Sequence, residues 1–117
     1  MGGDTTTVLV VDDDPSLRLL CRVNLELEGY AVVEAGTIDE AEQALDNGVV
    51  DVVLLDMHLG AEQGISLVPM LEKRGLASSV ALLTGSPGSR LPEGSMVIPK
   101  PFAIDDLTGT VRRLAES

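Results

Sequence analysis

Aromatic side chains are almost missing from this chain. Its 117 residues include no tryptophan, and Tyr30 and Phe102 are the only two aromatic residues. A hydrophobic core must therefore be built from leucine, valine, isoleucine, methionine and alanine. The chain also has no row of aromatic rings on which the bases of a single-stranded nucleic acid could stack.

Cysteine and positive charge are equally scarce. Cys21 is the single cysteine, which excludes an internal disulfide and a thiolate metal cluster and fits a small buried residue on a helix. Eight lysine and arginine residues stand against nineteen aspartate and glutamate residues, so the net charge is −11. A chain of this charge repels nucleic acid and anionic membranes on average. We therefore expect no direct nucleic-acid binding.

Long hydrophobic runs are absent as well. The apolar runs are a few residues long, far short of a bilayer span, and the N-terminus Met1-Gly2-Gly3-Asp4 lacks the basic and apolar stretches of a signal peptide. We expect a cytoplasmic protein without membrane insertion. The length predicts a single domain over residues 1–117, with its core over roughly residues 6–115.

The chain does contain five short apolar runs of strand length. They are near-continuous rather than alternating, which is typical of strands covered on both faces. Because helical patterns fall between them, we predict an α/β fold. It is a doubly wound, five-stranded parallel sheet of the flavodoxin-like kind, with strand order 2-1-3-4-5 and right-handed crossovers. The five runs are Val8 to Val11, Ala31 to Val33, Val49 to Leu55, Val80 to Leu83 and Met96 to Ile98.

The first two helices have clear start signals. Asp14 is a suitable N-cap and Pro15 a suitable first helical residue, while Thr37 to Glu40 reads as a capping box. The apolar face of the first helix comprises Leu17, Leu20, Cys21 and Leu25.

The later helices are less regular. A third helix is expected from Gly64 or Ile65 to Arg74, with Pro69 as its weak point. The last begins near Ile104 or Asp105 and buries Leu107, Val111 and Leu114. Between them, the segment from Gly85 to Ser95 is rich in glycine and proline, so the helix expected before the fifth strand is missing or vestigial.

Polar residues follow several of these runs. Asp12 and Asp13 come after the first strand, Asp56 ends the third, Thr84 ends the fourth and Lys100 follows the fifth. In open α/β sheets the carboxyl ends of the strands form the ligand site, so we expect these five side chains to converge. Three carboxylates, a hydroxyl and an ammonium indicate a hard, oxygen-bound cation beside a phosphoryl group.

The chain resembles the receiver domain of two-component response regulators (CheY-like). Four blocks occur in the family's order and cover nearly the whole chain. They are Val-Leu-Val-Val-Asp-Asp-Asp-Pro at 8–15, Asp-Val-Val-Leu-Leu-Asp-Met-His-Leu at 51–59, Leu-Leu-Thr-Gly at 82–85 and Pro-Lys-Pro-Phe at 99–102.

The resemblance implies roles for the site residues. Asp56 would accept a phosphoryl group from a sensor histidine kinase or histidine phosphotransfer protein, and the domain would then switch its binding to a downstream partner. Asp12, Asp13, Asp56 and the backbone carbonyl of His58 would hold Mg²⁺ or Mn²⁺. Thr84 and Lys100 would contact the phosphoryl oxygens, and the Lys100-Pro101 peptide would be cis. Such a domain is a phosphoacceptor in signalling rather than an enzyme. Asp14, the third aspartate of the run, is expected to cap the first helix and not to bind the metal ion.

Three departures from the family pattern stand out. Gly60 replaces the usual proline and should loosen its loop. Val97 replaces the usual switch aromatic. Lys100 follows Thr84 by only 16 positions (100 − 84), which leaves little room for a fourth helix. The last two departures predict a remodelled output face.

Two other functions remain open from the residues. A pseudo-receiver would bind partners without phosphorylation, although retention of all five site residues argues against it. A small Mg²⁺-dependent phosphatase would use Asp56 as nucleophile, but such enzymes usually carry an acidic residue where His58 stands. A flavodoxin-like nucleotide binder is disfavoured because no glycine-rich loop follows the first strand.

Overall fold

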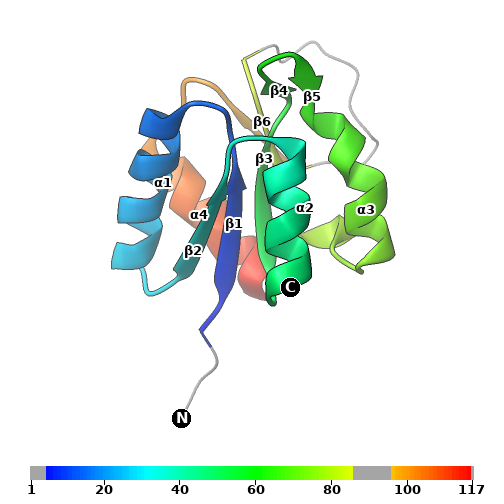
Figure 1. Ribbon diagram of the computed structural model, residues 1–117. Helices are drawn as coiled ribbons and strands as arrows, with labels where there is room; N and C mark the ends of the chain where they lie inside the picture. The colour runs from blue at the N-terminus through cyan, green and yellow to red at the C-terminus, as the bar shows by residue number, and fades with distance from the viewer. Residues whose placement is uncertain (1–4, 86–95, 117) are drawn as a thin grey trace.

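The computed structural model describes residues 5–85 and 96–116, and its centre is a five-stranded parallel sheet (Figure 1). The strand order is β2-β1-β3-β6-β7, which is the predicted 2-1-3-4-5 order when only this sheet is counted. The chain is therefore flavodoxin-like, as predicted. The strands are β1 (Thr7–Val11), β2 (Ala31–Ala35), β3 (Val52–Asp56), β6 (Val80–Thr84) and β7 (Met96–Pro99).

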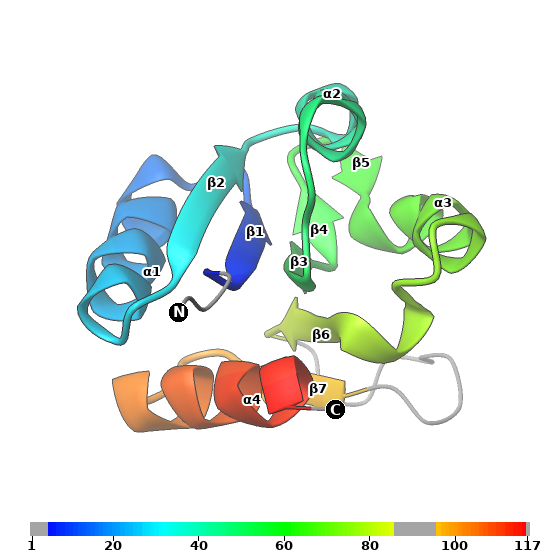
Figure 2. The same cartoon turned by 90° about the horizontal axis from the view of Figure 1, so that it is seen from below.

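Four α-helices cover the two faces of this sheet in the described part of the chain. They are α1 (Pro15–Leu27), α2 (Ile38–Asn47), α3 (Val68–Lys73) and α4 (Ile104–Glu116). Figure 2 shows α1 and α4 on one face and α2 and α3 on the other. None of the helices among the described residues combines the length and the apolarity that a membrane crossing requires.

The near-continuous apolar runs are explained by two cores, one on each face. Along β1, Val8 and Val10 pack into the core beneath α1 and α4, while Leu9 and Val11 pack into the core beneath α2 and α3. Successive side chains of a strand point to opposite faces, so a strand buried on both sides must be apolar at every position. Burial of Cys21 on α1 is also confirmed.

The predicted helix starts are confirmed, with one shift. The Asp14 carboxylate accepts the N–H of Ser16 at 2.9 Å and Pro15 is the first residue of α1. The Thr37 hydroxyl accepts the N–H of Glu40 at 3.1 Å. The return bond of this capping box goes from the Gly36 N–H to Glu40, one residue earlier than the standard pattern.

The third helix begins later than predicted. Residues Gly64–Leu67 form a 3₁₀ turn, and α3 starts at Val68, so Pro69 lies in its first turn where no internal hydrogen bond is lost. A second 3₁₀ turn, Ala77–Ser79, leads into β6.

The third strand is also shorter than its apolar run. Val49 is 80% exposed, because the chain joins the sheet only at Asp51, whose carboxylate accepts the N–H of Thr7 at 2.8 Å. In α1, Leu20 is exposed although it was expected on the buried face. The C-terminal helix α4 buries Leu107, Val111 and Leu114 as predicted.

The segment in which the sequence predicts no regular helix is largely outside the described residues, which omit 86–95. The prediction of a missing or vestigial fourth helix therefore stays a prediction. The helix labelled α4 (Ile104–Glu116) is the C-terminal helix, which the sequence predicts, and it is not the helix expected to be missing before the last strand.

A small hairpin was not predicted. Strands β4 (His58–Leu59) and β5 (Glu62–Gln63) pair antiparallel directly after β3. Gly60, in the turn between them, has a positive φ of 61°, a conformation that glycine adopts without strain. The hairpin stands at the upper edge of the sheet in Figure 1, where the strands end.

Candidate functional site

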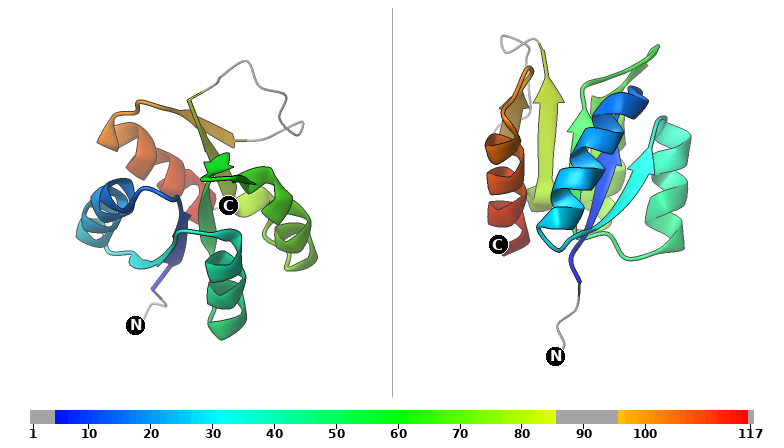
Figure 3. Two further views of the ribbon diagram at one scale, coloured as in Figure 1. Left: turned by 45° about the horizontal axis from the view of Figure 1, so that its top comes forward. Right: turned by 90° about the vertical axis from the view of Figure 1, so that its left-hand side faces the viewer.

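Four strands deliver polar side chains to the same edge of the sheet. Asp12 follows β1, Asp56 is the last residue of β3 and Thr84 is the last residue of β6, while Lys100 follows β7. In the left view of Figure 3 this edge is turned toward the viewer. Because the strands are parallel and in register, their carboxyl ends lie side by side, which is why residues far apart in sequence meet there.

The three carboxylates form a compact oxygen cluster. One carboxylate oxygen each from Asp12, Asp13 and Asp56 lies within 4.8 Å of the other two. Asp12 and Asp56 are buried, whereas Asp13 is exposed and marks the side open to solvent. Oxygen ligands of this kind suit a hard divalent cation such as Mg²⁺, so the residues present fit the ion.

A single ammonium bridges the two buried acids. The Nζ atom of Lys100 lies 3.1 Å from Oδ2 of Asp12 and 3.2 Å from Oδ2 of Asp56. The backbone N–H of Lys100 donates to the carbonyl of Thr84 at 2.8 Å, and the Lys100-Pro101 peptide is cis, as the resemblance implied. Within the described residues, Lys100 is the cation that pairs with these carboxylates, and its one positive charge is outnumbered by their three negative charges.

Backbone N–H groups orient each carboxylate. The Asp12 carboxylate accepts the N–H of Asp14 at 2.9 Å, and that of Asp56 accepts the N–H of His58 at 3.1 Å. The Asp13 carboxylate accepts the N–H of Gly60 at 3.1 Å. Each acid is therefore held by a main-chain donor of the surrounding loops.

Burial and the charges of the cluster change the pKa of two of its members, Asp12 and Lys100. Burial raises the pKa of Asp12 above 3.8; the N–H of Asp14 and the ammonium of Lys100 oppose this, and the charge of Asp56 adds to it. For Lys100, burial lowers the pKa, but the hydrogen bond to Asp12 and the charges of Asp12 and Asp56 outweigh it and raise the pKa above 10.5. The site therefore favours an ammonium at Lys100 and disfavours ionisation of Asp12.

This edge and the fold point to one family, and comparison with known proteins agrees. A model of the response regulator receiver domain matches residues 8–112. The chain belongs to the response regulator receiver domain family. Receiver domains are signalling domains of two-component systems.

Among curated relatives, the transcriptional regulatory protein AruR of Pseudomonas aeruginosa is 40% identical over 83 residues, which cover 67% of this chain and 34% of AruR. The transcriptional regulatory protein KdpE of Mycobacterium tuberculosis is 34% identical over 114 residues, which cover 92% of this chain and 50% of KdpE. This receiver domain therefore spans half or less of the length of these two relatives.

Solved receiver domains share the fold. The receiver domain of NtrX from Brucella abortus is 28% identical with a TM-score of 0.83, covering 94% of this chain and 98% of that one. The response regulator TrrA from Thermotoga maritima, solved in complex with Mg²⁺ and BeF, is 28% identical with a TM-score of 0.81, covering 94% and 99%.

Thr84 and His58 take different places in the receiver domain. Thr84 is fully buried at the end of β6. The side chain of His58 is exposed at the start of β4, and its backbone N–H is bonded to Asp56. A metal-ligand role for the His58 carbonyl stays a prediction.

Sequence reasoning missed the contribution of Gly60. The glycine in place of the usual proline predicts only a looser loop. The structure adds a contact that a proline could not make, because proline has no N–H to donate to Asp13. The missing proline was therefore a usable signal, but its partner could not be read from the sequence.

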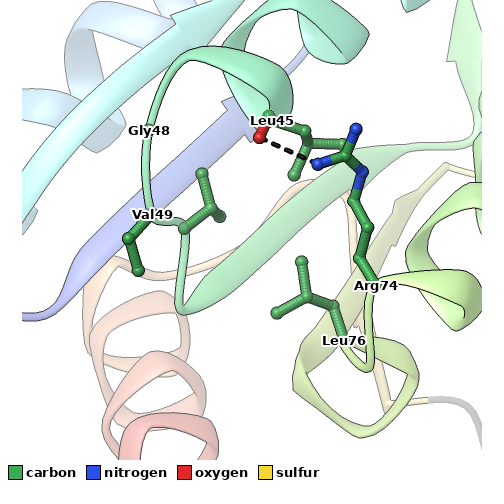
Figure 4. Close-up of a pocket in the computed structure, with 6 residues that line it drawn as sticks. Leu45, Gly48, Val49, Arg74 and Leu76 are labelled. Carbon is green, nitrogen blue, oxygen red and sulfur yellow. Dashed lines mark hydrogen bonds between the residues drawn. The ribbon is translucent and has the colours of Figure 1, made fainter.

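A small pocket of about 170 Å³ lies at the opposite end of the sheet from the acids, before the start of β3 (Figure 4). Its one charged lining residue, Arg74, already donates to the carbonyl of Leu45 at 2.9 Å and pairs with Asp46. The pocket holds no nucleophile or acid among its lining residues, which are Leu45, Gly48, Val49, Val50, Arg74 and Leu76.

The raised pKa of Asp12 predicts an unusual dependence of stability on pH. Because its pKa is raised, the Asp12 carboxyl binds its proton more tightly in the folded protein than in the unfolded chain, and this stabilises the fold below pH 3.8. The stabilisation is lost as the pH rises through the raised pKa. Asp12→Asn should therefore gain stability relative to wild type as pH rises. Urea unfolding in EDTA from about pH 4 to about pH 8 measures this difference. A difference that stays constant or shrinks would contradict the assignment.

Proposed function

We propose that this chain, as a single receiver domain over residues 1–117, accepts a phosphoryl group on Asp56 in the presence of Mg²⁺ or Mn²⁺. The donor would be a phosphohistidine of a sensor histidine kinase or of a histidine phosphotransfer protein. The observation that carries the proposal is the Lys100 ammonium, which bridges Asp12 and Asp56 beside a cluster of three carboxylates. The group stays on the domain's own side chain, so the domain acts in signalling.

In the proposed transfer, a carboxylate oxygen of Asp56 attacks the phosphorus. A P–O bond forms while the P–N bond to the donor histidine breaks, and the imidazole nitrogen leaves with that electron pair. When bound, the divalent ion would neutralise charge on the phosphoryl oxygens; Asp12, Asp13, Asp56 and the carbonyl of His58 would hold it.

Two further residues would act on the phosphoryl group itself. Lys100 already faces Asp56 at 3.2 Å and would bind a phosphoryl oxygen from its ammonium. The hydroxyl of Thr84 would bind another. Because Thr84 pairs in register with Pro99 of β7, a shift of Thr84 toward the phosphoryl group would move the β6–β7 edge and change partner binding there.

An exposed apolar stripe on α1 supports a protein donor. Leu19 and Leu27 are 57% and 78% exposed, and Leu20 and Val23 are exposed between them. The helix begins at Pro15, directly after the acidic loop, so a protein that delivers a phosphohistidine to Asp56 can also cover this stripe. A small phosphate donor would not need it.

No observation favours the alternatives. A pseudo-receiver would not require the crowded acids, which carry a cost in charge repulsion. A phosphatase with an aspartate nucleophile usually carries an acidic residue two positions later, and here that position is the exposed His58.

The proposal is tested with the wild-type protein, Mg²⁺ and acetyl phosphate, followed by intact mass. We expect the mass of one added phosphoryl group, which should not appear when EDTA is present during the labelling. With beryllium fluoride in place of acetyl phosphate, we expect amide shifts near Thr84 by NMR. Repeating the labelling with a phosphorylated histidine phosphotransfer protein tests the donor class. No adduct and no shifts would favour the pseudo-receiver, whereas steady turnover of phosphate esters would favour the phosphatase.

A further inference from the structure

Arg18 lies on α1 directly behind the acidic loop and is bonded to its backbone. The Nη1 atom of Arg18 donates to the carbonyl oxygen of Asp12 at 2.6 Å. Its Nε atom pairs with Oε1 of Glu34 on β2 at 3.1 Å. The side chain of Arg18 is 20% exposed, so most of it is shielded from water. The guanidinium therefore links β2 to the residue that supplies one of the three acids.

Glu34 and Gly36 are the neighbours that define the position of this guanidinium. Arg22 pairs with the other oxygen of Glu34, with Nε 2.7 Å from Oε2, so the two arginines contact Glu34 through separate oxygens. At position 36, a Cβ atom would lie 3.0 Å from Nη1 of Arg18, and glycine leaves that space open. The planar guanidinium thus has two hydrogen-bonded partners, the Asp12 carbonyl and Glu34, and the lack of a side chain at position 36 leaves room for it.

The backbone of Asp12 is consequently held on both sides. Its N–H donates to the carbonyl of Ala35 at 3.0 Å and its carbonyl accepts from Arg18. The Asp12 carboxylate in turn contacts Lys100 and the N–H of Asp14. A shift of the Asp12 peptide would move this carboxylate away from the other two acids.

We propose that Arg18 is a positioning residue for the divalent-cation site, acting through the Asp12 carbonyl rather than through its charge. The inference rests on the proposed function, since it concerns the ion expected there. Charge and position predict opposite effects. By charge alone, removing a cation near three carboxylates should strengthen Mg²⁺ binding. If Arg18 positions Asp12, its removal should weaken Mg²⁺ binding.

The test compares Arg18→Ala with Arg22→Ala. Both variants remove one guanidinium from α1 and one ion pair with Glu34, but only the first removes a bond to the acidic loop. Titration with MgCl₂ alone, followed by amide NMR, should show Kd raised about tenfold in Arg18→Ala, as for other groups that orient metal ligands, and little changed in Arg22→Ala. In EDTA, hydrogen exchange at the Asp14 amide should speed up only in Arg18→Ala.

Arg18→Lys provides a second variant. It keeps the charge, but its single ammonium cannot replace the separate Nη1 and Nε donors that reach Asp12 and Glu34, so its Kd for Mg²⁺ should also rise. Urea unfolding checks that each variant folds. Equal Kd values for Arg18→Ala and Arg22→Ala, or tighter binding in Arg18→Ala, would overturn the inference. If wild type itself bound no Mg²⁺, the proposed function would fail instead, and the exchange rate at Asp14 would still decide whether Arg18 positions the loop.

Discussion

Asp56→Asn should abolish acyl-phosphate formation and, in the absence of metal, make the fold more stable. The amide has no anionic oxygen to attack phosphorus, so no adduct should form with acetyl phosphate and Mg²⁺. Stability should rise because the substitution removes one charge from three carboxylates whose oxygens lie within 4.8 Å of one another. The expected gain is about 1 kcal/mol, after discounting the lost pairing with Lys100.

The measurements are intact mass after labelling and urea unfolding in EDTA and in Mg²⁺. Wild type should gain more stability from Mg²⁺ than Asp56→Asn, because the variant offers one ligand charge fewer. A phosphoryl adduct on the variant would place the acceptor elsewhere. Lower stability of the variant in EDTA would show that the Lys100 pair outweighs the repulsion among the acids.

Gly64→Ala should destabilise the fold severely, by about 3 kcal/mol or more. A Cβ atom at position 64 would lie 1.8 Å from the carbonyl oxygen of Asp56 and 2.9 Å from its carbon, distances that no rotamer change can relieve. The approach is close because the N–H of Gly64 donates to the carbonyl of Met57 at 2.9 Å. The backbone must therefore move to accept the alanine, and the backbone in contact is that of Asp56, the proposed phosphoacceptor.

Gly109→Ala is the matched control. Gly109 lies within α4, and a Cβ atom there would meet nothing within 4 Å. Alanine should raise the stability by about 0.5–1 kcal/mol, since glycine is a poor helix former. Urea or thermal unfolding compares the two variants. If Gly64→Ala lost less than about 1 kcal/mol, the close approach to Asp56 would be wrong.

The strands and the acids of the site could be read from the chain because their signals are local. A strand buried on both faces must be apolar at each position, and Val8 to Val11 shows this directly. The Asp14 cap and the helix after it depend on neighbouring residues only. Once parallel strands are inferred, their shared carboxyl edge brings Asp12, Asp56 and Lys100 together without further information.

Other features depend on residues that are distant in sequence, and no local pattern predicts them. The hairpin after β3 was not foreseen, and its turn residue Gly60 meets Asp13 across 47 positions. The Arg18 guanidinium reaches Glu34 of β2 only because α1 packs against that strand.

Leu20 fits the buried face by its spacing, yet it is exposed, because the packing of the whole helix decides which positions face the core. The chain alone therefore supplied the fold class and the acidic edge, whose signals lie within single segments. Packing between segments decided how the acids are oriented and which backbone groups hold them, since those hydrogen bonds exist only when separate elements meet.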